Sequence, residues 1–340
     1  MDYKQSGVDI DAGNEVVRRI RTLAKRTFTP GVLSEIGSFG GLFSVASAGL
    51  TDPVLVASAD GVGTKLRVAF MTGIHNTVGR DLVNHCVNDI LVQGAVPLFF
   101  LDYLATGRLD PDVAVQIVEG LAAACHDNGC ALLGGETAEM PGFYADGEYD
   151  VAGFIVGAVE RARVIDGRTI AAGDVLIGLP SSGLHTNGYS LARRIAFDVA
   201  GLRVTDFVPA LGATVGEALL RPHRSYLPVI RPLLATGLIK GMAHITGGGL
   251  TDNLPRIFPG GTGARIDRRT WRVPPLFEWL QQEGRVPVDD MLRTFNMGIG
   301  LIVVCRSADA ETVIEKLAEA GEPAALRIGE IVDGAGVSYS

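Results

Sequence analysis

The stretch "SADGVGTKLRVAF" places an aspartate, two glycines, a threonine and a lysine close together, from Asp60 to Lys65. A Walker phosphate-binding loop needs a glycine, four residues and then Gly-Lys-Ser/Thr, whereas here Thr64 precedes Lys65. Gly61 and Gly63 would let backbone N–H groups approach an anion closely. Asp60 would repel a phosphate unless a cation lay between them, which makes it a candidate magnesium ligand. The alternative is an ordinary turn after a strand, for which Asp-Gly is common.

A second set of polar residues falls on one side of the helix that the apolar periodicity predicts within residues 77–94. This polar side consists of Asp81, Asn84, His85, Asn88 and Asp89. Solvated helix faces usually carry Lys, Glu, Arg and Gln, which are better helix formers. Asp, Asn and His suit contact with a metal or a polar ligand. We therefore interpret this side as functional, and a solvated face is the alternative.

Three further loops at predicted strand ends carry polar residues beside glycines. Glu136 follows two glycines in "LLGGETAEMPGFY". His185 and Asn187 lie in "SSGLHTNGYS", and His244 precedes three glycines in "AHITGGGLTDN". A helix that begins behind glycines favours bound anions. Taken singly, His185 and His244 are more often core or capping residues than catalysts, but the repetition of this arrangement along the chain favours a ligand site.

The elements that would position these loops read as alternating strands and helices. The runs "PVLVASA", "PLFFLDYLAT", "YDVAGFIVGAVE" and "VLIGLP" predict strands. "PDVAVQIVEGLAAACHDNG" begins with a proline and ends at a glycine, as a helix does. The chain has 340 residues, enough for two domains that each bury a core. The polar segment "DGRTIAAGD" predicts a domain boundary, which gives domains of residues 1–168 and 169–340. The alternation of strands and helices predicts the fold class α/β (α+β).

The composition restricts the possible partners. The formal net charge is −8 and no dense Lys/Arg run is present, which argues against nucleic acid and anionic membranes as partners. The chain begins without an apolar signal segment, and no apolar run approaches the roughly twenty residues that span a bilayer. The four cysteines form no CxxC pair and predict reduced thiols. Together these features predict a soluble cytoplasmic protein.

Long segments of the chain together resemble one family, the aminoimidazole ribonucleotide synthetases, or phosphoribosylformylglycinamidine cyclo-ligases, of purine biosynthesis. The matching segments stand in the family's order, cover nearly the whole chain and are jointly specific: "SGVDIDAGN", "DGVGTKL", "VNDILVQGAVPLFFLDYLATG", "GGETAEMPGFY", "YDVAGFIVG", "SSGLHTNGYSL", "AHITGGGLTDNLPR" and "RTFNMGIG". The wider superfamily shares the ATP loop with thiamine monophosphate kinase, selenophosphate synthetase and the amidotransferase that acts before this step.

The resemblance implies a homodimer of two-domain α/β subunits. The amino-terminal domain, 1–168, would bind ATP and pair its sheet with that of a second subunit to form a shared β-barrel. The carboxy-terminal domain, 169–340, would complete the active site. The implied reaction converts formylglycinamidine ribonucleotide and ATP to aminoimidazole ribonucleotide, ADP and phosphate.

This chemistry explains the residue types in the loops. Phosphorylation turns the formamide oxygen into a good leaving group, and the amidine nitrogen then attacks the formyl carbon. Phosphoryl transfer needs magnesium held by carboxylates and positive charge near the phosphates. Ring closure needs a base for the amidine proton, and a histidine titrates in the right range.

The resemblance also implies individual roles. Asp60, Asp89 and Glu136 match positions associated with metal-bound nucleotide, so the resemblance implies that they are magnesium ligands. Lys65 would contact phosphate and assist catalysis, with a surface lysine as the alternative. His185 and His244 are candidates for acid–base catalysis or substrate-phosphate contact, and their order stays open. The remaining nucleotide contacts would come from Gly61, Gly63, Thr64, Asn187 and Lys25, although Arg21 or Arg26 could replace Lys25.

Three alternatives can be weighed on the sequence. Selenophosphate synthetase would carry a reactive cysteine in the amino-terminal Gly-rich region, and no cysteine precedes Cys86. Thiamine monophosphate kinase would carry an aspartate in the loop that here reads "HITGGG". A non-catalytic dimeric nucleotide-binding protein would be free to lose the loop carboxylates, which are all present here. The cyclo-ligase is therefore the favoured prediction.

Overall fold

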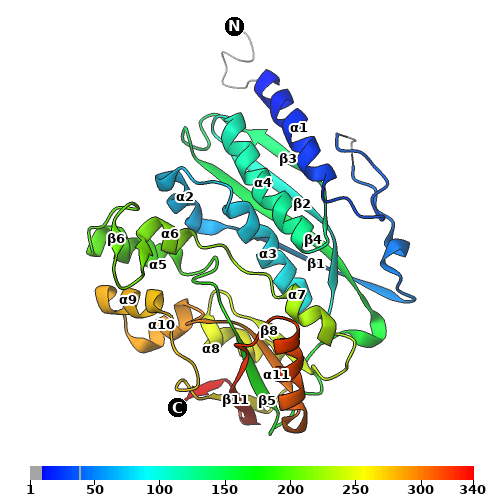
Figure 1. The fold of residues 1–340 in the computed structure, drawn as a ribbon, viewed down its shortest axis with the longest axis vertical. Coiled ribbons are helices and arrows are strands. Elements are labelled where there is room, and N and C mark those ends of the chain that lie inside the picture. The colour runs from blue at the N-terminus through cyan, green and yellow to red at the C-terminus, as the bar shows by residue number, and fades with distance from the viewer. Residues whose placement is uncertain (1–9, 38–39) are drawn as a thin grey trace. The chain divides into compact units, whose positions relative to one another are not determined.

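The computed structural model describes residues 10–37 and 40–340 and divides the chain into two compact units. The first unit runs to Ile90 and resumes over Ala95–Glu160, and the second comprises Leu91–Gly94 and Arg161–Ser340. The segment "SGVDIDAGN" lies partly outside the described residues. Each unit contains its own sheet with helices packed against it (Figure 1). The expected mixed α/β fold with two domains is therefore present.

The first unit is built on a four-stranded sheet in the order β1-β4-β2-β3. Strand β4 is antiparallel to both β1 and β2, whereas β2 and β3 are parallel. The strands are β1 (Pro53–Gly61), β2 (Val96–Thr106), β3 (Ala131–Glu139) and β4 (Tyr149–Glu160). The helices are α1 (Ile10–Lys25), α2 (Leu66–Thr72), α3 (Val78–Leu91) and α4 (Pro111–Asp127), with the short 3-10 turns η1 (Val45–Ala48) and η2 (Gly63–Lys65).

One face of this sheet is covered and the other is open. Along β4, Val151, Gly153 and Ile155 are buried, whereas Phe154 between them is 47% exposed. This alternation follows the two-residue period of a strand. A Cβ at Gly153 would overlap the side chains of Leu82 on α3 and Phe100 on β2, so a glycine is needed for this packing. Helix α3 thus lies against the covered face.

Helix α3 is almost completely enclosed. All of its residues are buried except Arg80 and Asp89, which are partly exposed. The solvated-face alternative for its polar side is therefore wrong. Asp81, Asn84, His85 and Asn88 lie within the packed interior, where polar groups require hydrogen-bonding or charged partners, and Asp89 is partly exposed.

The second unit is built on a six-stranded sheet in the order β12-β9-β11-β5-β10-β8. Its neighbouring strands are antiparallel except for β9 and β12. The core over this sheet includes Leu176, Ile266, Ile302, Val304 and Ile328. The strands of the sheet are β5 (Val175–Pro180), β8 (Gly241–His244), β9 (Thr262–Ile266), β10 (Ile299–Cys305), β11 (Leu326–Asp333) and β12 (Val337–Tyr339), and β6 (Phe207–Val208) pairs separately with β7 (Ala213–Thr214).

Short helices connect these strands. They are η3 (Arg161–Arg163), α5 (Tyr189–Arg193), the π-helical η4 (Arg194–Val199), α6 (Val215–Leu220), α7 (Leu227–Ile230), η5 (Arg231–Leu233), α8 (Gly249–Asn253), η6 (Leu254–Ile257), α9 (Pro275–Gly284), α10 (Val288–Thr294), η7 (Ser307–Asp309) and α11 (Ala310–Glu319). The four cysteines of the chain are free, buried thiols. Among the described residues, no helix combines the length and the apolar character that crossing a membrane requires.

Candidate active site

Asp60 lies near the end of β1, where the chain leaves the sheet. Its Oδ1 accepts a hydrogen bond from the Gly61 N–H at 2.7 Å, and its Oδ2 lies 2.6 Å from Nε2 of His85. Gly63 has a φ of 69°, a left-handed conformation that favours glycine, and it opens the turn η2 that leads into α2. The Asp60 side chain remains 40% exposed. The turn therefore fixes the carboxylate at a partly open edge of the sheet.

A second carboxylate shares the same histidine. Asp89 Oδ2 lies 3.6 Å from His85 Nε2 and accepts a hydrogen bond from Ser58 Oγ at 3.1 Å. His85 and Asp89 are one helical turn apart on α3, and Ser58 lies on β1 two residues before Asp60. The predicted pair Asp60 and Asp89 is thus brought together, with His85 between the two carboxylates.

Asp60 and His85 stabilise each other's charged forms. Burial raises the pKa of Asp60, but the hydrogen bond from His85, the charge of His85 and the Gly61 N–H outweigh it and leave the pKa lowered. Burial lowers the pKa of His85, but Asp60, Asp89 and Asp81 raise it overall. Ionised carboxylate oxygens are the ligands that magnesium prefers. Asp60 and Asp89 therefore form a donor set that fits a divalent cation.

Glu136 does not join this pair within the unit. The paired positions Asp60, Gly153, Asp102 and Gly135 form one row across the sheet from β1 to β3. Residues in such a row point to the same face, and the next residue along a strand points to the other face. Glu136 follows Gly135 and is exposed on the open face, in register with Tyr103.

The same row contains a carboxyl group that the sequence did not indicate. Asp102 points to the covered face, where burial raises its pKa to about 7. Gly135 is its neighbour on β3, and a Cβ at that position would overlap the Asp102 carboxylate. Asp102 is therefore a titratable, largely enclosed carboxyl group on the covered face of the sheet.

Lys65 is not a surface lysine. Its side chain is fully buried, and Nζ lies 2.8 Å from Oδ1 of Asp81 on α3. Burial lowers the pKa of Lys65, and Asp81 opposes part of that shift. In this arrangement the ammonium group is directed to Asp81 within the unit, whereas Gly63 and Thr64 beside it are exposed. Lys25 at the end of α1 pairs with Glu35 at 2.7 Å, and both of these side chains are exposed.

In the second unit, His185 lies in the loop between β5 and α5. It has a φ of 61°, unusual for a residue with a side chain, and it is completely buried. Its Nε2 accepts a hydrogen bond from the Ser182 N–H at 3.1 Å. A nitrogen that accepts a hydrogen bond carries no proton, so this geometry corresponds to a neutral imidazole with its proton on Nδ1. The ring of His185 stacks on that of His223, with centroids 3.9 Å apart.

His244 ends β8, and its Nε2 lies 3.0 Å from Nε2 of His223. His223 thus contacts both predicted histidines. The sequence reasoning missed it because it stands in "LRPHRSYLP", away from the glycines and helix starts that marked the other loops. The only signal in the sequence is that His223 is one of the six histidines of the chain.

Asn187 is positioned beside the glycines that follow His244. A Cβ at Gly247 would lie 3.4 Å from Oδ1 of Asn187. The Nδ2 group of Asn187 is buried and has no hydrogen-bond partner among the described residues. A buried donor of this kind needs a partner to offset its desolvation, and a bound ligand would supply one.

Asn296 holds the loop that carries His185. Its Nδ2 donates to the Gly183 carbonyl at 2.9 Å, and its Oδ1 accepts from Ser181 Oγ at 2.9 Å and from the Gly298 N–H at 2.8 Å. These three bonds tie the start of β10 to the end of β5. They explain the presence of Asn296 in the segment "RTFNMGIG", whose role the sequence did not give.

Comparison with known proteins connects both units to one family. The model of the AIR synthase related protein, N-terminal domain, matches residues 46–159, and that of the C-terminal domain matches residues 171–340. The phosphoribosylformylglycinamidine cyclo-ligase of Trichlorobacter lovleyi is 56% identical over 97% of this chain and 94% of its own length. That of Sorangium cellulosum is 55% identical over 97% and 95%. The chain belongs to the phosphoribosylformylglycinamidine cyclo-ligase family.

The family assignment covers both groups of polar residues. The amino-terminal match contains Asp60, Asp89 and Glu136, and the carboxy-terminal match contains His185 and His244. Among solved structures, the thiamine-monophosphate kinase of Stenotrophomonas maltophilia K279a superposes with a TM-score of 0.68 over 96% of each chain, at 20% identity. At this identity the likeness establishes a common fold. The sequence prediction of the cyclo-ligase family is confirmed.

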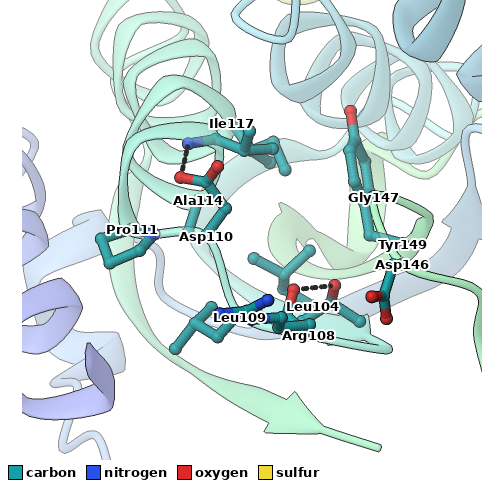
Figure 2. Close-up of a pocket in the computed structure, with 12 residues that line it drawn as sticks. Leu104, Arg108, Leu109, Asp110, Pro111, Ala114, Ile117, Asp146, Gly147 and Tyr149 are labelled. Carbon is teal, nitrogen blue, oxygen red and sulfur yellow. Dashed lines mark hydrogen bonds between the residues drawn. The ribbon is translucent and has the colours of Figure 1, made fainter. Parts of the chain in front are cut away.

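The first unit of this cyclo-ligase family member also contains a cavity of about 480 Å³ (Figure 2). It lies where β2 leads into α4 and where the chain enters β4. Its walls combine apolar side chains such as Leu104 and Ile117 with the charged residues Arg108, Asp110 and Asp146. The site residues predicted from the sequence, Asp60 and Asp89 included, do not line this cavity.

Proposed function

We propose that this chain catalyses the ATP-dependent cyclisation of formylglycinamidine ribonucleotide to 5-aminoimidazole ribonucleotide, with release of ADP and phosphate. The observation that carries the proposal is the 56% identity to a named cyclo-ligase over nearly the full length of both chains. The reaction phosphorylates the formamide oxygen, after which the amidine nitrogen attacks the formyl carbon. Both reacting groups belong to one substrate, so holding it folded supplies much of the acceleration.

In the first unit, Asp60 and Asp89 would hold the magnesium ion that accompanies ATP. When bound, the ion would neutralise charge on the phosphates. The exposed backbone of Gly63 would present its N–H group to an anion at the same turn, whereas the Gly61 N–H donates to Asp60. The support for this assignment is the convergence of two carboxylates on His85 and the lowered pKa of Asp60. The proposed role of Lys65 is to hold Asp81 and thereby α3, which carries Asp89.

In the second unit, His185 and His244 are the proposed acid–base residues for the amidine proton. The hydrogen bond from Ser182 supports a neutral imidazole at His185, and the Nε2 lone pair would have to exchange the Ser182 N–H for the amidine proton. Asn187 would donate a hydrogen bond from its Nδ2 group to a phosphate or carbonyl oxygen of the substrate. The support is the buried Nδ2 group, for which the described residues provide no acceptor.

We also propose that the cyclo-ligase is a homodimer that pairs the open faces of two first-unit sheets. Leu55, Tyr103 and Phe154 lie on that face and are 55%, 37% and 47% exposed. Large apolar side chains gathered on one sheet face favour coverage by another protein surface. Four strands are too few to close a barrel alone, so a shared barrel would need a second copy. Glu136 lies on the same open face and would then face the partner.

The test of the activity is phosphate release from ATP in the presence of the formylated amidine ribonucleotide. The expected result is stoichiometric formation of ADP, phosphate and the cyclised product. ATP alone and the substrate without its formyl group are the matched controls, and both should release only background phosphate. Nucleotide binding without any substrate-dependent release would instead support the non-catalytic nucleotide-binding protein.

The test of the dimer is light scattering at micromolar concentration. The expected mass is twice that of the 35.8 kDa chain. Phe154→Lys places a charge on the open face and should shift the mass toward the monomer. Thr51→Lys, at an exposed position before β1, adds the same single charge away from the centre of that face. A folded monomer in the wild type would defeat the dimer proposal.

A further inference from the structure

The second unit contains three histidines in contact, of which His223 has no role in the reaction described above. His223 Nε2 lies 3.0 Å from Nε2 of His244, and its ring stacks on that of His185 with an angle of 17° between the planes. All three side chains are buried. We propose that His223 is a positioning residue that fixes which nitrogen of His244 carries a proton and holds the His185 ring in place. The proposal rests on the proposed acid–base roles of these two histidines.

The contact between His223 and His244 requires opposite protonation at the two Nε2 atoms. Two imidazole nitrogens at 3.0 Å form a hydrogen bond only if one carries a proton and the other does not. In a neutral pair, the ring that donates keeps its Nδ1 unprotonated, and the ring that accepts carries its proton on Nδ1. His223 therefore sets whether Nδ1 of His244 is an acceptor or a donor, which is the property that a general base or acid requires.

The surrounding loop holds the His223 ring in this place. Ser182 Oγ donates to the Pro222 carbonyl at 2.7 Å, next to His223 in the chain. Thr186 Oγ1 lies 3.4 Å from Nδ1 of His223. Tyr226 Oη donates to the Pro180 carbonyl at 2.8 Å, which ties the following residues to the end of β5. These contacts fix His223 between the His185 loop and the end of β8.

The geometry favours this positioning role over a shared metal ion. The ligand nitrogens of His185, His223 and His244 lie within 4.8 Å of one another, a separation at which a metal could be considered. However, a histidine binds a metal along a line in its ring plane, and two nearly parallel stacked rings direct these lines side by side instead of to one point. The Nε2 of His185 is also engaged with the Ser182 N–H. The hydrogen-bonded pair is thus the better description.

The experiment compares His223→Phe with His223→Gln. Phe keeps a flat ring against His185 but cannot hydrogen-bond to His244, whereas Gln keeps a hydrogen-bonding group of similar reach. Side-chain ¹⁵N spectra of the histidines report the tautomer of His244, with His244→Asn as the assignment control. In the Phe variant, the ¹⁵N chemical shifts of the two ring nitrogens of His244 should move from the values typical of one tautomer toward the average of the two tautomers. The kcat for cyclisation should fall about tenfold or more, with the KM for ATP unchanged.

The Gln variant should recover most of the lost kcat and the wild-type His244 spectrum. If the Phe variant does not fold, His223→Asn, whose side chain is too short to reach His244, replaces it in the same comparison. An unchanged His244 spectrum together with normal kcat in the variant that cannot hydrogen-bond would overturn the proposal. So would stoichiometric Zn²⁺ binding to the wild type that both the Phe variant and His244→Asn abolish. The spectra do not depend on turnover, so an inactive wild type would count against the proposed function while His223 is still tested.

Discussion

The buried ion pair between Lys65 and Asp81 gives the sharpest test of how the first unit is held together. Both side chains are completely buried, and their charged atoms lie 2.8 Å apart. Lys65→Met removes the ammonium group and leaves the Asp81 carboxylate inside the unit without that partner. Breaking a buried pair in this way costs about 3–5 kcal/mol of unfolding free energy, because a charge stays in a medium that solvates it poorly. We expect a loss of this size.

The same helix offers a matched control. Arg80 pairs with Asp127 at 2.9 Å, but these side chains are 39% and 57% exposed. Exposed pairs contribute about 0–1 kcal/mol, so Arg80→Ala should change the stability little. Hydrogen exchange of the α3 amides is the assay, because Trp271 and Trp279, the two tryptophans of the chain, lie in the second unit and their fluorescence would not report the first. A loss for Lys65→Met no larger than that for Arg80→Ala would refute the reasoning.

A double variant separates the structural role of Lys65 from the catalytic role that the family resemblance implied. Lys65→Met with Asp81→Asn removes both charges with little change in size, and most of the lost stability should return. If Lys65 acts by holding α3, this folded double variant should retain most of its turnover. If the ammonium reaches a phosphate during the reaction, the double variant should be stable but lose turnover by about a hundredfold.

Three further outcomes follow from the site geometry. Asp60→Asn should lower turnover about a hundredfold or more at saturating magnesium. The thermal midpoint should move little, since the Asp60 side chain is partly exposed and Asp89 stays beside His85. Near-normal activity would return the loop to an ordinary turn. Burial raises the pKa of Asp102 from 3.8 to about 7, so the folded state holds this proton more tightly and stability falls as the pH rises between these values. Between about pH 4 and about pH 8, the wild type should lose on the order of 4 kcal/mol of unfolding free energy through this group, and Asp102→Asn should abolish that loss. The measurement is the unfolding free energy of the wild type minus that of the variant at each pH. A difference that does not change with pH would contradict the prediction. His185→Ala should lower kcat about a hundredfold with ATP affinity retained, whereas full kcat per folded molecule would leave His244 as the base.

The strands were the most predictable part of the fold. The runs "YDVAGFIVGAVE" and "VLIGLP" coincide with β4 and β5, because apolar stretches with β-branched residues between turns favour strands. Helices in the second half were less predictable. The sequence predicts one helix over residues 225–236, but this segment divides into α7 and η5. Each has a proline near its start, and proline lacks the N–H group that an α-helix interior needs. The sequence also predicts a helix over residues 188–200, which changes to π geometry after Arg193.

The site was predictable where it depends on local spacing and unpredictable where it depends on strand register. Asp89 could be placed beside a ligand because helical periodicity puts it on the same side as His85. The separation of Glu136 from Asp60 depends on which residues pair across three strands, and a shift of one residue would reverse the face. The contact of His223 with His244 joins a loop to a strand end 21 residues later, and no local pattern encodes it.

The polar side of α3 shows why composition pointed in the right direction for an incomplete reason. Its Asp, Asn and His residues indicate ligand binding on the sequence alone, because they are poor choices for a solvated helix face. Several of them instead pair with buried groups on neighbouring elements. Asp81 pairs with Lys65, and Asn84 accepts a hydrogen bond from Asn128 at 2.9 Å. Short polar side chains suit a buried face because they lose little conformational entropy and reach nearby partners. The buried pairs near the start of α3 would then fix the helix so that His85 and Asp89, one turn further on, meet Asp60 at the sheet edge.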